Sequence, residues 1–190
     1  MPPATRSRRP EKPPSPLDPA ALDAIAVRHV ERFQTTRARL VRLLRQKLRE
    51  RGWVEDGPAP EPEQIADRMV ELGYISDAAF AEARTRGLQR RGMGLARVRA
   101  SLSAHGVGQE DSARAMAAHR PVRAALDFAR RKRLGPFGPP ATEQKTRERQ
   151  FAAMVRAGHP PRLAHDILRA ETVEAAEAML NDAMPDEEGG

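Results

Sequence analysis

Residues 94–107 read GLARVRASLSAHGV, and this stretch decides the fold class because it contains a whole helix with its stop signal. Val98 and Leu102 lie four residues apart, on one face of an α-helix. Gly106 follows Leu102 by four positions, and Val107 comes next. Glycine readily adopts the left-handed conformation that ends many helices, and the next apolar side chain folds back onto the last turn. The pattern predicts a helix that ends at Gly106 and is covered by Val107.

This helix ending recurs along the chain. An apolar residue is followed four positions later by glycine and then by a large side chain in Leu48-Gly52-Trp53, Met69-Gly73-Tyr74 and, less regularly, Met154-Gly158-His159. The preceding segments also align, with copies that begin at Thr36, Gly94 and Thr146 and so lie 58 and 52 residues apart. Periods near 50 residues indicate tandem supersecondary units. Each unit has few large apolar residues, so its stability depends partly on its neighbours.

Start signals divide the chain into nine expected helices. β-branched residues are few and never alternate, whereas good helix formers fill long stretches. The helices are expected to begin at or just after Asp18-Pro19, Thr36, Pro62, Ser76, Gly94, Gln109, Pro121, Thr142 and Pro161. The first is expected to reach about Phe33, the sixth His119 and the seventh Gly135-Pro136, while the ninth either stops near Glu171 or continues towards Leu180. The predicted fold is all-α, with three tandem three-helix-bundle repeats in an elongated, curved molecule.

The same start and stop signals of the helices set the expected domain boundaries. The N-terminus is predicted to be a disordered, basic, Pro-rich tail, and the C-terminus a disordered acidic one. The expected segments are the tail 1–16, repeat 1 at 17–72, repeat 2 at 73–119, repeat 3 at 120–184 with a loop at 135–141, and the tail 185–190.

Composition narrows the compartment and the class. The chain contains no cysteine, which excludes disulfides and cysteine metal sites and is typical of a reducing cytosol. No run approaches the roughly 20 apolar residues of a membrane span. The tail 1–16 has no apolar stretch, so it is not expected to be a secretory signal. A cytoplasmic protein without membrane contact is expected.

Charge is distributed unevenly. The net charge is +7, but residues 84–133 contain thirteen basic and three acidic side chains, whereas 171–190 contains seven acidic side chains and no Lys or Arg. Such an excess favours an anionic partner for the middle of the chain. The alternative is that the abundance of arginine over lysine, of which there are four, partly reflects GC-rich coding.

Catalytic and cofactor motifs are missing from the sequence. The five histidines show no metal-binding spacing, and there is neither a Gly-x-Ser-x-Gly elbow nor a phosphate-binding loop. Gly92-Met93-Gly94 is either a flexible helix connection or an anion contact flanked by Arg91 and Arg97. Asp67 and Glu71 lie at helical spacing among basic residues, so they are expected to form surface salt bridges with those residues and not to act as an acid–base pair. We therefore expect a protein that is not an enzyme and needs no cofactor or metal.

Ten basic side chains are the candidate binding residues. Arg86 and Arg90 lie one helical turn apart, and the run 130–133 ends a helix, where cations complement the helix dipole. The candidates are Arg84, Arg86, Arg90, Arg91, Arg97, Arg99, Arg130, Arg131, Lys132 and Arg133. They are expected to form one band, although a solvated face is the alternative for any single arginine.

Aromatic residues are scarce and are expected to serve the core. Phe33, Phe80, Phe128 and Phe151 fall on apolar stripes, and Trp53 and Tyr74 follow helix ends. No aromatic set alternates with basic residues as a platform for single-strand stacking would. The basic band therefore favours phosphate groups or an acidic protein groove over base readout.

One stretch resembles the RecX family. It reads Leu72-Gly73-Tyr74-Ile75-Ser76-Asp77-Ala78-Ala79-Phe80-Ala81, followed by Arg91-Gly92-Met93-Gly94, Arg97-Val98, Leu102 and Gly106-Val107. The segment Phe33-Gln34-Thr35-Thr36-Arg37-Ala38-Arg39-Leu40 is also similar to family members. Ser76 stands where the family usually has Asp, and His105 where it prefers Lys or Arg. The resemblance spans about 17–169 and is loosest in the third repeat.

The resemblance implies a specific role. RecX-like proteins are cytoplasmic modulators of the RecA recombinase, built from three tandem three-helix repeats. They lodge in the groove of the RecA–DNA filament and mainly inhibit its recombinase, ATPase and LexA-coprotease activities, in recombination, repair and the SOS response. The ten candidate residues are expected to face that filament, with a monomer as the working form. The alternatives are a non-specific DNA-binding architectural protein, for which weak contact with single- or double-stranded DNA would suffice, and a scaffold that joins other proteins.

Overall fold

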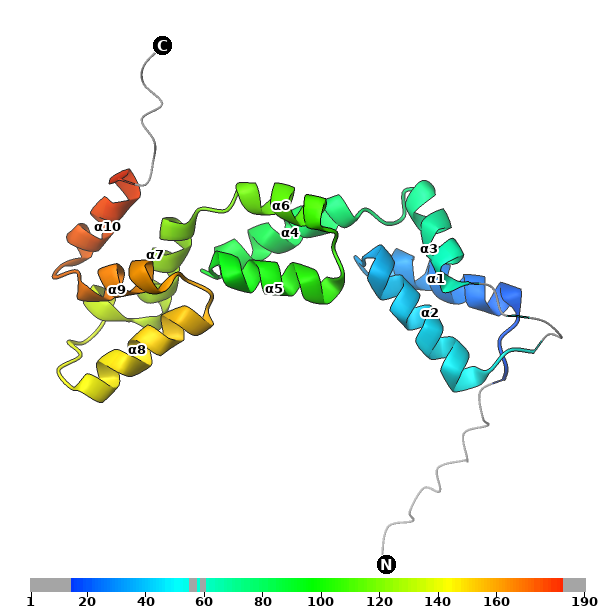
Figure 1. The fold of residues 1–190 in the computed structure, drawn as a ribbon, viewed down its shortest axis with the longest axis horizontal. Coiled ribbons are helices and arrows are strands. Elements are labelled where there is room, and N and C mark those ends of the chain that lie inside the picture. The colour runs from blue at the N-terminus through cyan, green and yellow to red at the C-terminus, as the bar shows by residue number, and fades with distance from the viewer. Residues whose placement is uncertain (1–14, 55–57, 59–60, 183–190) are drawn as a thin grey trace, which may run out of the picture. The chain divides into compact units, whose positions relative to one another are not determined.

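The computed structural model describes residues 15–54, 58 and 61–182 (Figure 1). Within these residues the secondary structure is helical, with ten α-helices, one short 3₁₀ turn and a single isolated β-bridge. The predicted all-α class is therefore confirmed. The chain forms two compact units, Met1–Ile75 and Ser76–Gly190, which we call unit 1 and unit 2. Apart from Ser15 and Pro16, the expected tails at 1–16 and 185–190 lie outside the described residues.

Unit 1 is built from α1 (Pro19–Arg32), α2 (Arg37–Arg51) and α3 (Pro62–Glu71), with α2 packed against both other helices. Two helix starts have the predicted caps. Asp18 Oδ1 accepts a hydrogen bond from Ala21 N–H at 2.7 Å, and Thr36 Oγ1 accepts one from Arg39 N–H at 3.2 Å. The apolar faces of the three helices meet in a core that includes Leu22, Leu40, Leu44, Ile65 and Met69.

The end of α2 differs from the expected left-handed cap. Gly52 has φ 75° but ψ 178°, so its backbone leaves the helix in an extended direction. The Gly52 carbonyl accepts a hydrogen bond from Leu17 N–H at 2.9 Å, and the Leu17 carbonyl accepts one from Val54 N–H at 3.0 Å. These bonds form a short parallel bridge between Leu17 and Trp53. Pairing with the segment before α1 thus replaces the predicted ending.

Unit 2 contains two apolar cores. Its elements are α4 (Asp77–Arg90), α5 (Leu95–His105), α6 (Gln109–Ala117), α7 (Pro121–Lys132), the 3₁₀ turn η1 (Gly135–Phe137), α8 (Gln144–Arg156), α9 (Pro161–Arg169) and α10 (Val173–Asp182). Helices α4 to α6 enclose Leu88 and Leu102, whereas α7 to α10 enclose Leu126 and Met154. Met93 packs against both cores. The repeat boundaries at 17–72, 73–119 and 120–184 and the elongated, curved outline stay predictions.

Three of the four glycine endings are Schellman motifs, as predicted. At Gly106, Val107 N–H donates to the Leu102 carbonyl at 3.1 Å, and the same pairing closes α3 at Gly73 and α8 at Gly158. Two further endings of this kind were not predicted. One closes α4 at Gly92, and the other closes α7 at Arg133, which takes the left-handed conformation with φ 56° although it has a side chain.

In the last part of unit 2 one expected boundary is wrong, and the ninth helix takes the shorter of its two expected lengths. Thr142 does not cap α8, because the helix begins one residue later and its N-cap, Glu143, makes no side-chain hydrogen bond. The ninth helix does not continue to Leu180. Ala170 adopts an extended backbone, and the Thr172 hydroxyl then accepts from Ala175 N–H at 3.1 Å to start the separate helix α10. The sixth and seventh helices also end slightly earlier than expected, at Ala117 and Lys132.

The aromatic side chains divide between core and surface. Phe128 is buried and Phe80 is half-buried, as predicted. Phe33 is 55% exposed and Phe151 is 36% exposed, so their assignment to the core is wrong. Phe33 follows the last residue of α1 with an extended backbone, and its side chain therefore leaves the apolar stripe of that helix.

Candidate partner-binding surface

The ten candidate residues all belong to unit 2. They lie on α4 (Arg84, Arg86, Arg90), at its end (Arg91), on α5 (Arg97, Arg99), on α7 (Arg130, Arg131, Lys132) and at the cap of α7 (Arg133). Because unit 2 is one compact body, the packing of these three helices decides which candidates share a surface.

The turn after α4 rests on the backbone of α7. Gly92 has φ 73°, and a Cβ atom at this position would lie 2.7 Å from Phe128 N and 3.0 Å from Ala124 O. Real Cβ atoms do not approach backbone atoms so closely, so only glycine allows this contact. The contact fixes the end of α4 against the middle of α7.

The start of α5 is held in the same region by the end of α8. Gly94 N–H donates to the Ala157 carbonyl at 2.9 Å, and Ala96 N–H donates to the Gly158 carbonyl at 3.3 Å. Gly94 is also buried. These amides are therefore satisfied within the protein, and the hypothesis that the Gly92-Met93-Gly94 segment contacts an anion is wrong.

Two buried histidines complete this junction. Nε2 of His119 lies 2.9 Å from Met93 O, and Nε2 of His159 lies 3.0 Å from Gly92 O, so each ring donates a hydrogen bond to the turn. Both Nδ1 atoms are buried and have no hydrogen-bond partner among the described residues. Burial lowers the pKa of His159, the hydrogen bond to Gly92 opposes this shift, and the nearby His119 lowers the pKa further. The two imidazole rings thus hold the turn in place between the two cores.

This junction brings the ends of α4 and α7 together. Arg131 Nη2 donates to the Arg90 carbonyl at 2.8 Å. We call the five basic residues at these ends the α4–α7 cluster, and they are Arg90, Arg91, Arg131, Lys132 and Arg133. All five are exposed. The side chains of Arg90, Arg91, Lys132 and Arg133 form no hydrogen bond or ion pair with other residues that the structure describes, so they can receive an external anion.

Three other candidates are engaged within the protein. Arg84 is half-buried and its Nε donates to Ser101 Oγ at 2.9 Å, between α4 and α5. Arg86 pairs with Glu82 on its own helix at 3.3 Å. Arg130 pairs with Glu177 of α10, and its guanidinium lies 5.1 Å from the centre of the Phe137 ring. Arg130 therefore ties α10 and η1 to α7 and is less available than the cluster.

The two candidates on α5 point in different directions. Arg97 and Arg99 are both exposed, and neither side chain has a hydrogen-bond or ion-pair partner in the described part of unit 2. Residues two apart on a helix differ by about 200° around its axis. A single flat partner surface can therefore engage one of them with the α4–α7 cluster, but not both.

An open pocket lies between η1, α8 and α9, and none of the ten candidate residues is among its lining residues. Its volume is about 770 Å³, and Phe151, Arg147, Glu148, His165 and Arg169 are among its lining residues. Arg147 Nη1 donates to the carbonyls of Ala141 and Thr142, at 3.0 and 2.7 Å, and so fixes the loop on one side of it. The pocket carries both signs of charge. Across 15–54 and 61–182, no group of three or more His, Asp or Glu side chains could hold a metal ion.

No helix in the described part of the chain is both long and apolar enough to cross a membrane. The binding chemistry that the α4–α7 cluster offers is that of exposed guanidinium and ammonium groups at a packed junction. These groups recognise carboxylate or phosphate oxygens through charge-assisted hydrogen bonds.

Comparison with known proteins identifies the family. A family model described as the second three-helix domain of RecX matches residues 76–116, which contain α4, α5 and most of α6. The chain is 30% identical over 165 residues to a regulatory protein RecX from Myxococcus xanthus, covering 82% of this chain and 88% of that protein. It is 27% identical over 162 residues to the RecX of Agrobacterium fabrum, covering 83% of this chain and 86% of that protein.

Solved structures share the fold. A crystal structure of RecX from Lactobacillus salivarius matches with a TM-score of 0.57 at 14% identity, over 85% of this chain and 96% of that chain. A second crystal structure of a regulatory protein RecX matches with a TM-score of 0.58 at 20% identity, over 80% and 73%. These relatives are named as regulatory proteins. The resemblance seen in the sequence motif is thus confirmed, and the chain belongs to the RecX family.

Proposed function

We propose that this protein binds the RecA–DNA filament in its groove and mainly inhibits the filament's recombinase, ATPase and coprotease activities. It acts in the cytoplasm as a monomeric regulator, not as an enzyme, in recombination, repair and the SOS response. Membership of the RecX family supports this role. The observation that carries it is the α4–α7 cluster, in which four exposed cationic side chains have no partner among the described residues.

The cluster has the chemistry of a docking surface for an anionic groove. When a partner binds exposed arginines that are not paired with a carboxylate of their own protein, the free-energy cost is small, because no internal ion pair has to break. Their planar guanidinium groups can bind carboxylates or phosphates through two hydrogen bonds at once. Opposite charges across the interface also accelerate the association of the two partners, and they weaken the binding of proteins that carry the wrong charge.

The rigid junction beneath the cluster explains how it can restrain a filament. The cations sit on helix ends that Gly92, His119 and His159 hold against two apolar cores. A filament subunit that contacts them is held by a body that does not deform, and it resists the rearrangement that growth or turnover requires. Contacts to more than one subunit would strengthen binding through effective concentration.

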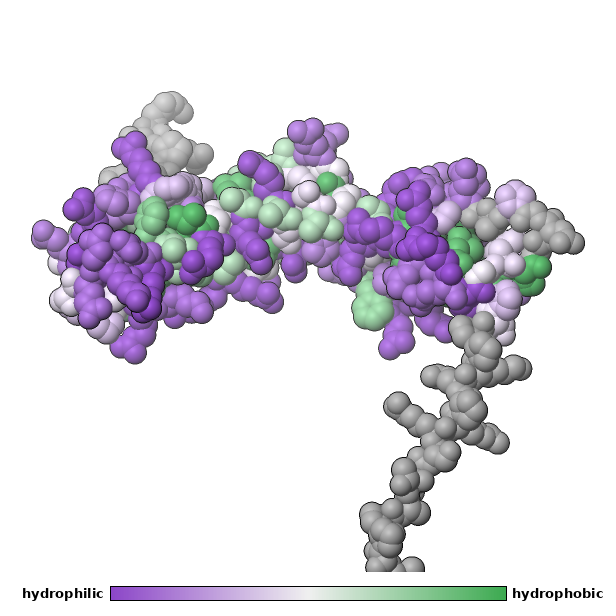
Figure 2. All heavy atoms as spheres, turned by 60° about the horizontal axis from the view of Figure 1, so that its bottom comes forward, coloured by the Kyte–Doolittle hydropathy of each residue, from purple (hydrophilic) through white to green (hydrophobic). Residues whose placement is uncertain are grey.

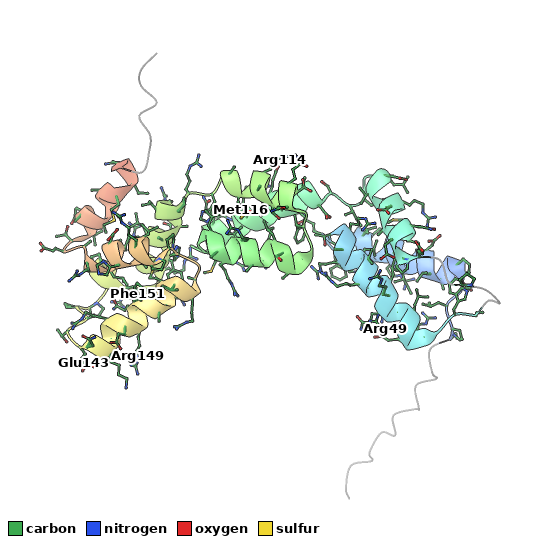
Figure 3. The ribbon with its side chains drawn as sticks, in the orientation of Figure 1. Arg49, Arg114, Met116, Glu143, Arg149 and Phe151 are labelled. Carbon is green, nitrogen blue, oxygen red and sulfur yellow. The ribbon has the colours of Figure 1, made fainter. Side chains whose placement is uncertain are left out.

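The test is inhibition of RecA-promoted strand exchange by Arg90→Glu/Lys132→Glu. We expect at least a tenfold loss of inhibitory potency with unchanged folding. The matched control is Lys145→Glu/Arg149→Glu on α8, which changes the charge equally and at exposed positions. Arg149 projects from α8 on the side away from α9 (Figure 3). Equal potency of the two double variants would refute the assignment of the cluster.

The second candidate function is non-specific DNA binding by an architectural protein, which the exposed arginines of α2, among them Arg39, Arg42 and Arg49, favour. The two functions differ in their dependence on RecA. Direct DNA binding needs no RecA and weakens steeply with salt, because phosphate contacts release counterions. A filament binder requires preformed filaments.

A further inference from the structure

The outward face of α2 in unit 1 carries a row of basic side chains. At about 100° per residue, Arg39, Arg42, Gln46 and Arg49 fall within an arc of about 80°. All four are exposed, whereas Leu40 and Leu44 on the opposite side of the helix are fully buried. In Figure 2, hydrophilic side chains cover most of the part of unit 1 that faces the viewer. None of the ten candidate residues belongs to this row, because all of them are in unit 2.

Two arginines of this row, Arg39 and Arg49, differ from Arg37 and Arg45 of the same helix. Arg37 is bound to Asp67, with Nη2 2.9 Å from Oδ2, and Arg45 pairs with Glu63, so both are turned towards carboxylates of α3. The side chains of Arg39 and Arg49 form no hydrogen bond or ion pair with residues in the described part of unit 1. Figure 3 shows Arg49 on the side of α2 away from α3. The row could not be recognised from the sequence, because net charge does not reveal which arginines are already paired.

A carboxylate does lie at one edge of the row, but it is already engaged. Glu50 accepts hydrogen bonds from Lys47 Nζ at 2.7 Å and Gln46 Nε2 at 2.6 Å. The bond from Lys47, followed by that from Gln46, lowers the pKa of Glu50. The local charge of Glu50 is therefore balanced mainly by Lys47, and the row remains cationic.

An exposed aromatic ring adjoins the start of the row. Phe33 is 55% exposed, its ring centre lies 5.3 Å from that of His29, and the Arg32 guanidinium lies 5.9 Å from the Phe33 centre. Partial burial lowers the pKa of His29, and the charge of Arg39 lowers it further, so Arg39 lies close to this ring pair. The surface thus offers an aromatic face at one end and arginines along its length.

We propose that this face binds single-stranded nucleic acid, with Arg39, Arg42 and Arg49 contacting successive phosphates and Phe33 stacking on a base. The row spans ten residues of helix, about 15 Å, which is long enough to follow several phosphates of one strand. Stacking on an aromatic ring requires a base with a free face, which a single strand provides and a duplex hides. An acidic protein surface would pair with the arginines, but Phe33 would add little to its binding free energy. This site is independent of the proposed contact between the α4–α7 cluster and RecA.

Fluorescence anisotropy with a labelled oligothymidylate and no RecA tests the site in the full chain. We expect Arg39→Gln/Arg49→Gln to weaken binding at least tenfold at low salt. Loss of two phosphate contacts should also reduce the slope of log K against log salt by about 1.4, at about 0.7 per contact for a single strand. The matched control is Lys145→Gln/Arg149→Gln, which removes the same charge from α8 and should bind within twofold of the parent.

Phe33→Ala separates stacking from charge. We expect it to weaken binding about fivefold to 100-fold while the salt slope stays unchanged. Both variants change exposed side chains, and circular dichroism melts should match the parent. No binding of the oligonucleotide by the parent, or equal losses in the row variant and the α8 control, would overturn the proposal. If Phe33→Ala bound the oligonucleotide as tightly as the parent, the stacking contact would be wrong. If Arg39→Gln/Arg49→Gln bound the oligonucleotide normally but no longer bound RecA, the face would be a protein-binding surface instead. Because RecA is absent from the anisotropy assay, its result is independent of the role proposed for unit 2.

Discussion

Gly94 and Gly158 pack backbone to backbone. A Cβ atom at Gly94 would lie 2.6 Å from His159 N and still closer to the Gly158 carbonyl, and one at Gly158 would lie 2.8 Å from the Arg97 Cβ. The start of α5 therefore lies directly on the end of α8, and this contact joins the two cores of unit 2. The geometry of the α4–α7 cluster depends on it, because the same turn positions the end of α4.

Gly94→Ala should destabilise unit 2. The φ of −74° at Gly94 suits alanine, so the cost arises from the overlap with the backbone of α8 and not from backbone strain. Overpacking of this kind costs about 1–3 kcal/mol, or more where neither backbone can move. Urea unfolding at neutral pH measures it. Gly87→Ala is the control, since its Cβ would meet only the end of Arg90 at 3.9 Å and should raise stability by about 0.5–1 kcal/mol. Equal effects of the two changes would contradict the packing account.

Acid should destabilise unit 2 through its buried His159. Burial lowers the pKa of His159 below its ordinary value of 6.5, so the folded state binds fewer protons than the unfolded state. The stability is then fully present above pH 6.5 and declines as the pH falls below that value. Protonation would also add an N–H to an Nδ1 atom that has no acceptor among the described residues. His29 in unit 1 has a lowered pKa too and acts in the same direction.

Urea unfolding of the parent and His159→Gln between pH 8 and pH 5 checks this expectation. The variant should be less stable at pH 8, because the hydrogen bond to Gly92 is lost or weakened, but its stability should fall less between pH 7 and pH 5. His29→Gln serves as a comparison from unit 1. Parallel pH profiles for the parent and His159→Gln would show that His159 does not titrate as inferred.

Arg133→Gly should stabilise the fold and weaken binding at the same time. Arg133 has a left-handed backbone, which costs a residue with a side chain roughly 1–2 kcal/mol relative to glycine. Glycine would recover part of that energy and would remove one cation of the α4–α7 cluster. Thermal unfolding and strand-exchange inhibition should therefore move in opposite directions. A more stable variant with full inhibitory potency would exclude Arg133 from the interface.

Arg130→Gln should affect α10 more than partner binding. Arg130 pairs with Glu177 and lies beside Phe137, so its removal frees α10 from α7. Hydrogen exchange in 173–182 should accelerate, while inhibition of RecA should change less than twofold. The expectation would be contradicted if Arg130→Gln lost as much inhibition as Arg90→Glu/Lys132→Glu while α10 stayed protected from hydrogen exchange. Arg130 would then belong to the binding surface.

Much of the fold could be predicted because its signals are local. Cap residues such as Asp18 and Thr36 and stop signals such as Gly106 act within one turn of a helix, and their hydrogen bonds are present as expected. Features that depend on distant segments could not be predicted. The bridge between Leu17 and Trp53 and the contact between Gly94 and Gly158 join segments 36 and 64 residues apart.

The candidate site was predicted less completely, for a related reason. Clustered charge in the sequence indicated candidate residues on α4, α5 and α7, but it did not reveal that Arg84 and Arg130 are engaged by Ser101 and Glu177. Nor did apolar periodicity show that α1 ends before Phe33 and leaves this ring exposed. Pairing and exposure follow from tertiary packing, which a pattern along one chain does not contain.

The most direct test of the regulatory account is co-sedimentation of the full chain with preformed RecA filaments on single-stranded DNA. The parent and Lys145→Glu/Arg149→Glu should pellet with the filaments, whereas Arg90→Glu/Lys132→Glu should stay largely in the supernatant. Retention of the cluster variant at the level of the parent would contradict the claim that the ends of α4 and α7 form the contact.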